Sequence, residues 1–343
     1  MLVNPYGTNT TGLYIYFDTD QPVTVRYTIH ADGYPDFSRT LNGSPSLEHE
    51  YQIIGMVPSA LNTITLELMD ESGEVIQQCS FEQQAPALLR GESFTTLTVE
   101  EGTSTQELGD TLYTMLGPQD KATFTYQPYT CAYDAAGVAR MEIPLVNYRT
   151  ERQTFANDLM YYNISYNTIV GVNSLGKMVE RFDLNHYSMH HDYTLGGDND
   201  LLVLATRDDD ITTEDRIVRV DLAICWGRSY DFSADPCYWD TGYDWFEDAI
   251  GNAGTPELNS YYYKYLVDEN AGTFSLVESI PVSYSGYISS VEDIGSTKVI
   301  CSGIATETVI LDENNELIQS MTSDYDYWWY RVFGYDYSGF WFA

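Results

Sequence analysis

Basic residues are scarce in this chain. Only 16 Lys and Arg side chains stand against 51 Asp and Glu side chains, which gives a formal net charge of −35 at pH 7. The acids are spread along the sequence rather than gathered in one tail, so they predict a solvated acidic surface. Such a surface repels polyanions, and it makes nucleic acid and anionic membranes poor partners. The charge does not indicate an oligomeric state.

Histidine is also rare, and its positions limit the chemistry. Imidazole is the side chain best suited to proton transfer or nucleophilic attack near neutral pH, because its ordinary pKa lies at about 6.5. No histidine follows residue 191. Any histidine-based reaction must therefore use one of five residues: His30, His49, His186, His190 and His191.

Long apolar runs and paired cysteines are missing as well. No window approaches the roughly 18 apolar residues of a spanning helix, and the first residues lack the basic region and apolar run of a secretory leader. The five cysteines lack zinc-site spacing, although Cys225 and Cys237 could close a short loop or stay reduced. Serine-nucleophile motifs and phosphate-binding glycine loops are absent too. We therefore expect no membrane span, no metal site and no cofactor.

Tyrosine, in contrast, is abundant. The 343 residues include 30 Tyr and 6 Trp, and aromatic side chains fit the pleated, half-buried surfaces of β-sheets. Strand-like runs alternate with turns over the first eighty or so residues, as at the hairpin signal Asp70-Glu71-Ser72-Gly73. The stretch over residues 82–91 then loses the alternation and carries proline and glycine. We predict an all-β chain with a small N-terminal β-sandwich over residues 1–85 and a second domain over 86–343.

The second domain repeats one pattern, an extended run followed by a polar turn and another extended run. The turns recur roughly every 40 to 50 residues, which is the period of a four-stranded propeller blade. This spacing predicts a β-propeller of five or six blades. The alternative is a meandering β-sandwich whose hairpins have this spacing by chance. The turns are marked by Asp134, Asn173, Asp221, Asp268 and Asp312.

The segment His190-His191-Asp192 is the main candidate for chemistry. It precedes a turn and the strand-like run Leu201 to Thr206. Inner strands of a propeller project side chains into the central channel, and neighbouring residues of a strand face opposite ways. One imidazole can then face a ligand while the other packs. The alternative is a purely structural pair. The aromatic run from Tyr325 to Phe342 leaves a similar choice between a ligand platform and the core of the closing blade.

Several segments, taken in order, resemble the bacterial arylsulfate sulfotransferases. They are spread over nearly the whole chain, and His190-His191-Asp192 ahead of Asn199-Asp200-Leu201-Leu202 is the most specific of them. The other segments are Asn4-Pro5-Tyr6-Gly7, Gly55-Met56-Val57-Pro58 with Asn62-Thr63-Ile64, Tyr133-Asp134-Ala135-Ala136-Gly137-Val138-Ala139-Arg140, and Asp244-Trp245-Phe246.

The resemblance implies a small β-domain followed by a six-bladed propeller, and transfer of a sulfuryl group from a phenolic sulfate ester to a phenol through a sulfated histidine. His190 and His191 fall where the family places a sulfate-contacting histidine, and the resemblance does not choose between them. Asp192 would orient an imidazole, and Arg207, Asp244 and Trp245 would bind substrate. Family members generally act outside the cytoplasm, which implies a periplasmic or extracellular protein.

The chain also departs from the family pattern. Glu247 stands where the family motif continues with histidine after Asp244-Trp245, and the later region with the family's nucleophilic histidine is missing, as in a shortened member. No arginine lies between Arg228 and Arg331, so a clamp for an anion is poorly provided for. These departures favour an alternative function, a catalytically inactive propeller that binds an aromatic, glycan or protein ligand.

Overall fold

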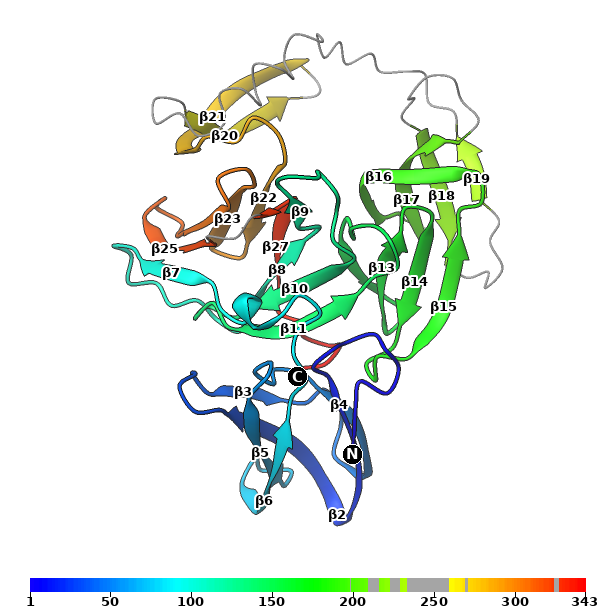
Figure 1. Ribbon diagram of the computed structural model, residues 1–343, viewed down its shortest axis with the longest axis vertical. Helices are drawn as coiled ribbons and strands as arrows, with labels where there is room; N and C mark the ends of the chain where they lie inside the picture. Colours follow the sequence, from blue (N-terminus) through cyan, green and yellow to red (C-terminus); the bar gives the residue numbers. More distant parts are fainter. Residues whose placement is uncertain (198, 209–215, 223–228, 233–258, 269–270, 324–326) are drawn as a thin grey trace.

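The computed structural model describes residues 1–197, 199–208, 216–222, 229–232, 259–268, 271–323 and 327–343. These residues form β-strands and one short 3-10 helix at Glu92–Phe94, which confirms the all-β prediction. No helix in the described part is long and apolar enough to span a membrane. The proposed Cys225–Cys237 pair lies outside the described residues. Figure 1 shows the N-terminal sheets in blue at one end of the molecule and the remaining sheets spread out beside them.

The N-terminal unit is the predicted β-sandwich. Its longest strand, β2, crosses from one layer to the other, because its register with β4 shifts between Asp18 and Val23. The first half of β2 pairs with β1 and β4, and the second half pairs with β3 and β5. The six strands are β1 (Leu2–Val3), β2 (Leu13–His30), β3 (Phe37–Thr40), β4 (Ser46–Ile53), β5 (Leu61–Met69) and β6 (Val75–Gln84).

Three four-stranded sheets of the described residues belong to the β-propeller. In the order in which neighbours pair, the first contains β11 (Ala139–Pro144), β10 (Tyr129–Tyr133), β8 (Leu112–Leu116) and β27 (Arg331–Tyr335). The second contains β12 (Gln153–Ala156), β13 (Leu159–Ser165), β14 (Thr168–Val172) and β15 (Met178–Asp183). The third contains β16 (Tyr187–Leu195), β17 (Asp200–Arg207), β18 (Arg216–Asp221) and β19 (Ser229–Phe232).

The remaining described strands form a five-stranded sheet and two pairs. The five-stranded sheet contains β22 (Ser289–Ile294), β23 (Thr297–Ser302), β24 (Glu307–Leu311), β25 (Leu317–Thr322) and β7 (Thr98–Glu101). The pairs are β20 (Asn259–Asp268) with β21 (Thr273–Ser283), and β9 (Gln119–Asp120) with β26 (Tyr327–Trp328). Strands from the two ends of the domain meet twice, because β27 pairs with β8 and β25 pairs with β7. These pairings join the C-terminal strands to the first strands of the domain.

The repeated polar turns take equivalent places in the sheets. Asp134 lies at the turn between β10 and β11, Asn173 at the turn between β14 and β15, and Asp312 at the turn between β24 and β25, whereas Asp221 ends β18 and Asp268 ends β20. The side chains of Asp134, Asn173 and Asp312 accept backbone hydrogen bonds within these turns. Asp312 Oδ1, for example, accepts hydrogen bonds from the backbone nitrogens of Asn314 (2.8 Å) and Glu316 (2.9 Å). The spacing read from the sequence therefore reflects real blades.

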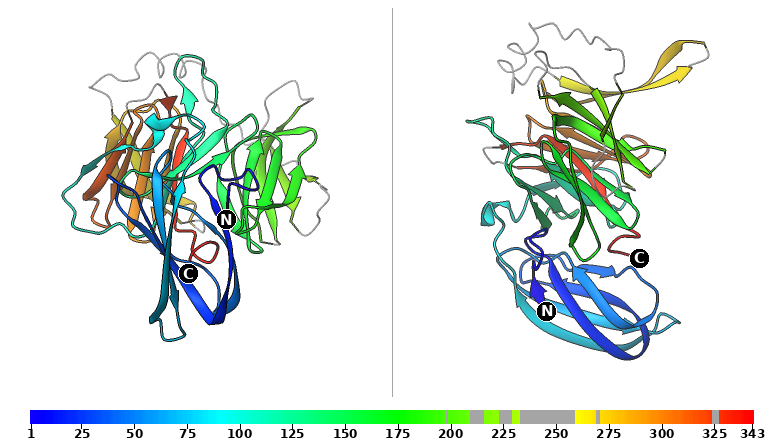
Figure 2. Two further views of the ribbon diagram at one scale, coloured as in Figure 1. Left: turned by 60° about the horizontal axis from the view of Figure 1, so that its bottom comes forward. Right: turned by 90° about the vertical axis from the view of Figure 1, so that its right-hand side faces the viewer.

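Arg140 joins the propeller to the sandwich. Its side chain is fully buried in β11 and donates to the backbone oxygens of Gly55 (3.1 Å) and Pro35 (2.8 Å) in the N-terminal unit. Asp134 Oδ2 accepts from Arg140 Nε at 2.6 Å and balances the buried charge. Three hydrogen bonds from one guanidinium group thus link the two units. The two views of Figure 2 show the N-terminal unit in blue against one side of the remaining sheets.

The C-terminal aromatic residues fill the junction between the two units. Tyr337, Phe340, Trp341 and Phe342 are buried in one cluster with sandwich residues that include Phe37. An isolated antiparallel β-bridge pairs Leu41 of the sandwich with Phe342. Trp341 Nε1 donates a hydrogen bond to Ser174 O in the propeller at 2.8 Å. This part of the aromatic run therefore serves as core.

Replacing Arg140 with methionine should destabilise the protein by about 3 kcal/mol, because Asp134 and two backbone oxygens lose their partner in a buried place. The matched control is Arg181→Met, which removes an ion pair with Asp183 at the surface. We expect that control to change stability by less than about 1 kcal/mol. Chemical denaturation measures both values, and equal effects of the two substitutions would contradict the role given to Arg140.

High pH should unfold the protein within a narrow range. Burial raises the pKa of Tyr287 and Tyr330 to about 12, from 10.0 for a free tyrosine. A group whose pKa is raised on folding contributes stability below its unfolded pKa and loses it as the pH rises through its folded pKa. Stability should thus fall between pH 10 and 12, with tyrosinate absorbance and circular dichroism changing together. Complete tyrosine ionisation with an intact fold would contradict this.

Candidate functional site

The candidate site begins with a bulge in β16. Met189 pairs with Ala205 and Tyr193 pairs with Val203, so three residues, His190 to Asp192, stand opposite Leu204 alone. His191 adopts a positive φ of 67°, as bulged residues do. Because β16 is the edge strand of its sheet, the bulge directs these side chains away from the ladder and toward neighbouring sheets.

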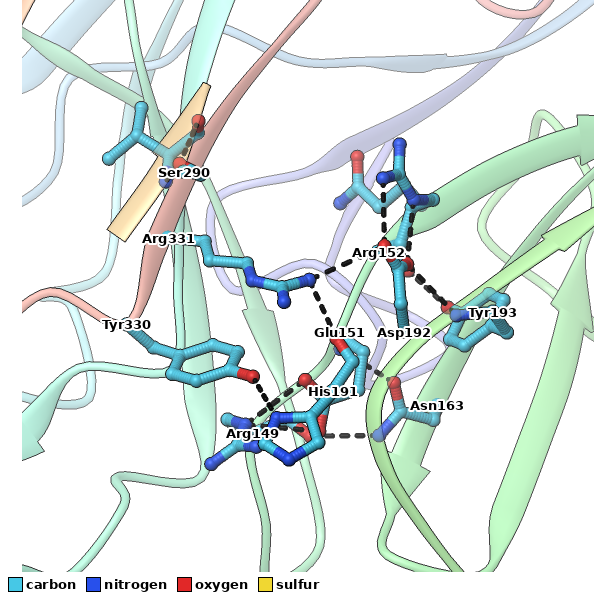
Figure 3. A network of polar contacts seen from close by, with 12 residues as sticks. Arg149, Glu151, Arg152, Asn163, His191, Asp192, Tyr193, Ser290, Tyr330 and Arg331 are labelled. Carbon is cyan, nitrogen blue, oxygen red and sulfur yellow. Dashed lines mark hydrogen bonds and ion pairs between the residues drawn. The ribbon is translucent and has the colours of Figure 1, made fainter. Parts of the chain in front are cut away.

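Arginines from two other sheets meet this bulge. Arg152, just before β12, donates from Nε to Asp192 Oδ1 (2.9 Å) and from Nη2 to Oδ2 (3.1 Å). Arg331, at the start of β27, places Nη1 at 3.4 Å from Asp192 Oδ2 and donates to His191 O at 2.6 Å. Figure 3 shows the Asp192 carboxylate between the two guanidinium groups. The edge strands of three sheets thus converge, as inner strands of a propeller do.

The two imidazoles occupy different environments. His191 is exposed, and its Nδ1 lies 3.2 Å from Tyr330 Oη. The His190 ring stands edge-on to it, with centroids 4.9 Å apart, and both His190 ring nitrogens are buried. Burial raises the pKa of Tyr330 to about 12, so that its phenol stays protonated at neutral pH. His191 is therefore an exposed residue with a neutral phenol as neighbour.

Tyrosine rings surround a third arginine beside His191. The Arg149 guanidinium carbon lies 3.6 Å from the ring centroid of Tyr330, 4.2 Å from that of Tyr126 and 4.8 Å from that of Tyr148. Cation–π attraction of this kind is strongest away from water. Arg149 Nε also donates to both carboxylate oxygens of the fully buried Glu151, at 3.0 and 3.1 Å. Burial raises the pKa of Glu151, and the Arg149 charge opposes that rise.

Backbone contacts hold this segment in place. Asn163 Oδ1 accepts from the Glu151 nitrogen at 2.8 Å, and Asn163 Nδ2 donates to Arg149 O at 2.8 Å. A few residues further along the chain, Phe155 of β12 packs against Tyr335, Tyr337 and Phe340 at ring-centroid distances of 5.5 to 6.1 Å. Since Tyr337 and Phe340 belong to the core shared with the sandwich, this packing anchors β12 to that core.

The residues predicted from the sequence separate into three groups. His190, His191 and Asp192 come together with the arginines described above. Arg207 pairs with Tyr187 across the β16–β17 ladder, three positions from His190 and roughly 10 Å along the strand. Asp244 and Trp245 lie outside the described residues. In the described part, no three His, Cys, Asp or Glu side chains gather as a metal site would require.

Sequence reasoning misses Arg149, Arg152 and Arg331, and it considers Tyr330 only as one member of the C-terminal aromatic run, which could form a ligand platform or a blade core. The sequence contains one signal for two of these arginines. Arg149-Thr150-Glu151-Arg152 puts two basic residues within four positions of a chain that has 16 in all. Arg331 carries no such signal, because it reaches the site only through the pairing of the last strand with β8. The absence of arginines between residues 228 and 331 therefore did not prevent a cluster of cations.

Comparison with solved structures and curated proteins adds little. Low similarity extends to a streptogramin B lyase (12% identity, 93% of this chain, 89% of that chain, TM-score 0.23). It also extends to an auxiliary nutrient binding protein from Bacteroides thetaiotaomicron (10% identity, 92% of this chain, 83% of that chain, TM-score 0.24). A third structure is apo AztD from Citrobacter koseri (8% identity, 91% of this chain, 98% of that chain, TM-score 0.19). No curated protein sequence matches significantly.

Family models give a clear assignment. Residues 1–85 match the arylsulfotransferase Ig-like domain. Residues 98–226, which include the His190–Asp192 bulge and the Arg149–Arg152 segment, match the arylsulfotransferase domain. The two matches follow each other along the chain in the order of its sandwich and propeller, and on these grounds the chain belongs to the arylsulfotransferase family.

Proposed function

We propose that the protein transfers a sulfuryl group from a phenolic sulfate ester to a phenol, with His191 as the nucleophile. The observation that carries the proposal is an exposed histidine whose backbone oxygen binds Arg331 and whose neighbour Asp192 binds both Arg152 and Arg331, in a chain with few cations. Arginine binds tetrahedral oxyanions through several N–H donors at once. Tyrosine rings around the site suit the aryl part of donor and acceptor.

His191 is a better nucleophile for this reaction than His190. The ring nitrogens of His190 are buried, so a sulfur atom cannot reach them without rearrangement. In the reactive tautomer of His191, Nδ1–H donates to Tyr330 Oη and Nε2 carries the lone pair. The protonated phenol of Tyr330 accepts that bond and orients the ring.

The reaction proceeds in two balanced steps. His191 Nε2 attacks the sulfur, an N–S bond forms, the S–O bond to the aryl group breaks, and phenolate leaves with the electron pair. An acceptor phenolate then attacks the same sulfur, breaks the N–S bond and regenerates imidazole. The proton lost by the acceptor phenol balances the proton gained by the released phenol. Arg152 and Arg331 hold the sulfuryl oxygens and orient the sulfur toward His191 Nε2, while the negative charge develops on the departing aryl oxygen.

The remaining predicted residues extend this proposal. Arg207, Asp244 and Trp245 stay predicted substrate contacts, and the family's usual location implies export from the cytoplasm. Fractionation of the native cells tests the location. A purely cytoplasmic protein would contradict it.

Replacing His191 with alanine should lower transfer from a chromogenic phenyl sulfate to a phenol at least a hundredfold, on the order of the loss of a nucleophile. Mass spectrometry of the wild-type protein mixed with donor alone should place a sulfuryl group on His191. His190→Ala should keep the label, and His186→Ala serves as the control for an exposed histidine away from the site. Labelling that survives His191→Ala would overturn the assignment.

Replacing Tyr330 with phenylalanine should reduce the rate constant for transfer about tenfold, because one hydrogen bond that selects the His191 tautomer is lost. The KM for the donor should change little, since Tyr330 acts on the imidazole. A matched control is Tyr166→Phe, an exposed tyrosine whose ring packs near Tyr148. An unchanged rate constant in Tyr330→Phe would show that this contact does not orient His191.

The second candidate function is binding without turnover. The observation that favours it is the pairing of all three arginines with carboxylates, since Asp192 and Glu151 already occupy donors that an ester would need. Stoichiometric binding of phenyl sulfate, with neither phenol release nor a labelled histidine, would select this function over the enzyme.

A further inference from the structure

Carboxyl groups share the candidate site with its arginines. Asp192 lies between Arg152 and Arg331, Glu151 binds Arg149, and Glu292 of β22 faces Arg152 while accepting a hydrogen bond from the Gly334 nitrogen at 2.9 Å. The positive charge of three guanidinium groups is therefore largely offset within a few ångströms. The protein around them carries a net charge of −35.

We propose that Asp192 makes this site selective for singly charged esters, so that it accepts sulfate monoesters and rejects phosphate monoesters of the same shape. The inference rests on the proposed function, because it assumes that the donor binds at Arg152 and Arg331. Sulfuryl and phosphoryl groups have similar size and the same tetrahedral arrangement of oxygens. Charge is what separates them near neutral pH.

The charge difference follows from acid strength. An aryl sulfate carries one negative charge at every physiological pH, whereas a phosphate monoester carries close to two above its second pKa of about 6. Coulomb energy is proportional to the charge of the ligand. Each carboxylate at the site therefore opposes a dianion twice as strongly as a monoanion, and each guanidinium group attracts it twice as strongly. Where these charges offset each other, no net attraction repays the larger cost of removing a dianion from water.

The position of Asp192 makes it the main source of this selectivity. A guanidinium group has five N–H donors, so Arg152 and Arg331 can hold Asp192 and a ligand anion together. A bound anion must then lie close to the Asp192 carboxylate, which is about one-third exposed. Glu151 is fully buried behind Arg149, and burial raises the pKa of both Glu151 and Glu292.

Three ligands with one aryl group test the inference by calorimetry at about pH 8, where the phosphate monoester is dianionic. They are phenylmethanesulfonate (one charge, no transferable group), methyl phenyl phosphate (one charge) and phenyl phosphate (two charges). The wild-type protein should bind both monoanions, and it should bind phenyl phosphate roughly tenfold more weakly. Asp192→Asn should remove most of that difference, and Arg331→Gln should widen it.

Asp183→Asn is the matched control, because it removes a carboxylate that pairs with Arg181 at the surface. If Asp192 were only structural, Asp192→Asn would weaken all three ligands equally and leave their ratio unchanged, which overturns the inference. If the protein binds phenylmethanesulfonate but Asp192→Asn leaves the ratio of the affinities for the monoanions and phenyl phosphate unchanged, the selectivity is contradicted and the proposed function is not. No binding of phenylmethanesulfonate to the wild-type protein overturns both.

Discussion

The ion pair between Asp192 and two arginines is the interaction on which the site depends. Asp192 belongs to β16, Arg152 precedes β12, and Arg331 opens β27, so one carboxylate ties together the edge strands of three sheets. None of these strands is next to another along the sequence. A bidentate geometry fixes Arg152 more firmly than a single contact would. The same pair brings His191 beside the cations, through the bond from Arg331 to its backbone oxygen.

The grouping of Arg149, Arg152 and Arg331 is notable because the chain has only 16 Lys and Arg residues against 51 Asp and Glu residues. Surface charges are screened over about 8 to 10 Å at physiological salt, so the local potential of the site is set by its own guanidinium and carboxylate groups more than by the acidic exterior. Tyrosine rings and buried carboxylates hold the arginines in place, as the contacts of Arg149 show. Aromatic packing around Phe155 anchors the neighbouring strand β12 to the core shared with the sandwich. The arrangement therefore combines an exposed imidazole, a group of guanidinium groups and an aromatic surrounding.

Much of the fold was predictable from sequence. Alternating apolar residues define the strands of the sandwich, and acidic or amide turn residues such as Asp312 recur with the blade period because their side chains stabilise the same turn. The His190–Asp192 segment was identified for its chemistry alone. Its partners were harder to predict, because Arg331 and Tyr330 lie about 140 positions away and meet the segment only when the last strand pairs with β8. The bulge that exposes His191 while burying the His190 nitrogens also depends on register, which no local pattern reveals.

A structure of the protein with phenylmethanesulfonate tests the central claim most directly, because the methylene group replaces the ester oxygen and prevents transfer. The account predicts that the sulfur lies about 3 to 3.5 Å from His191 Nε2, as expected for atoms about to react. The sulfonate oxygens should accept hydrogen bonds from Arg152 and Arg331. A ligand bound elsewhere on the propeller, or at these arginines with His191 turned away from the sulfur, would contradict it.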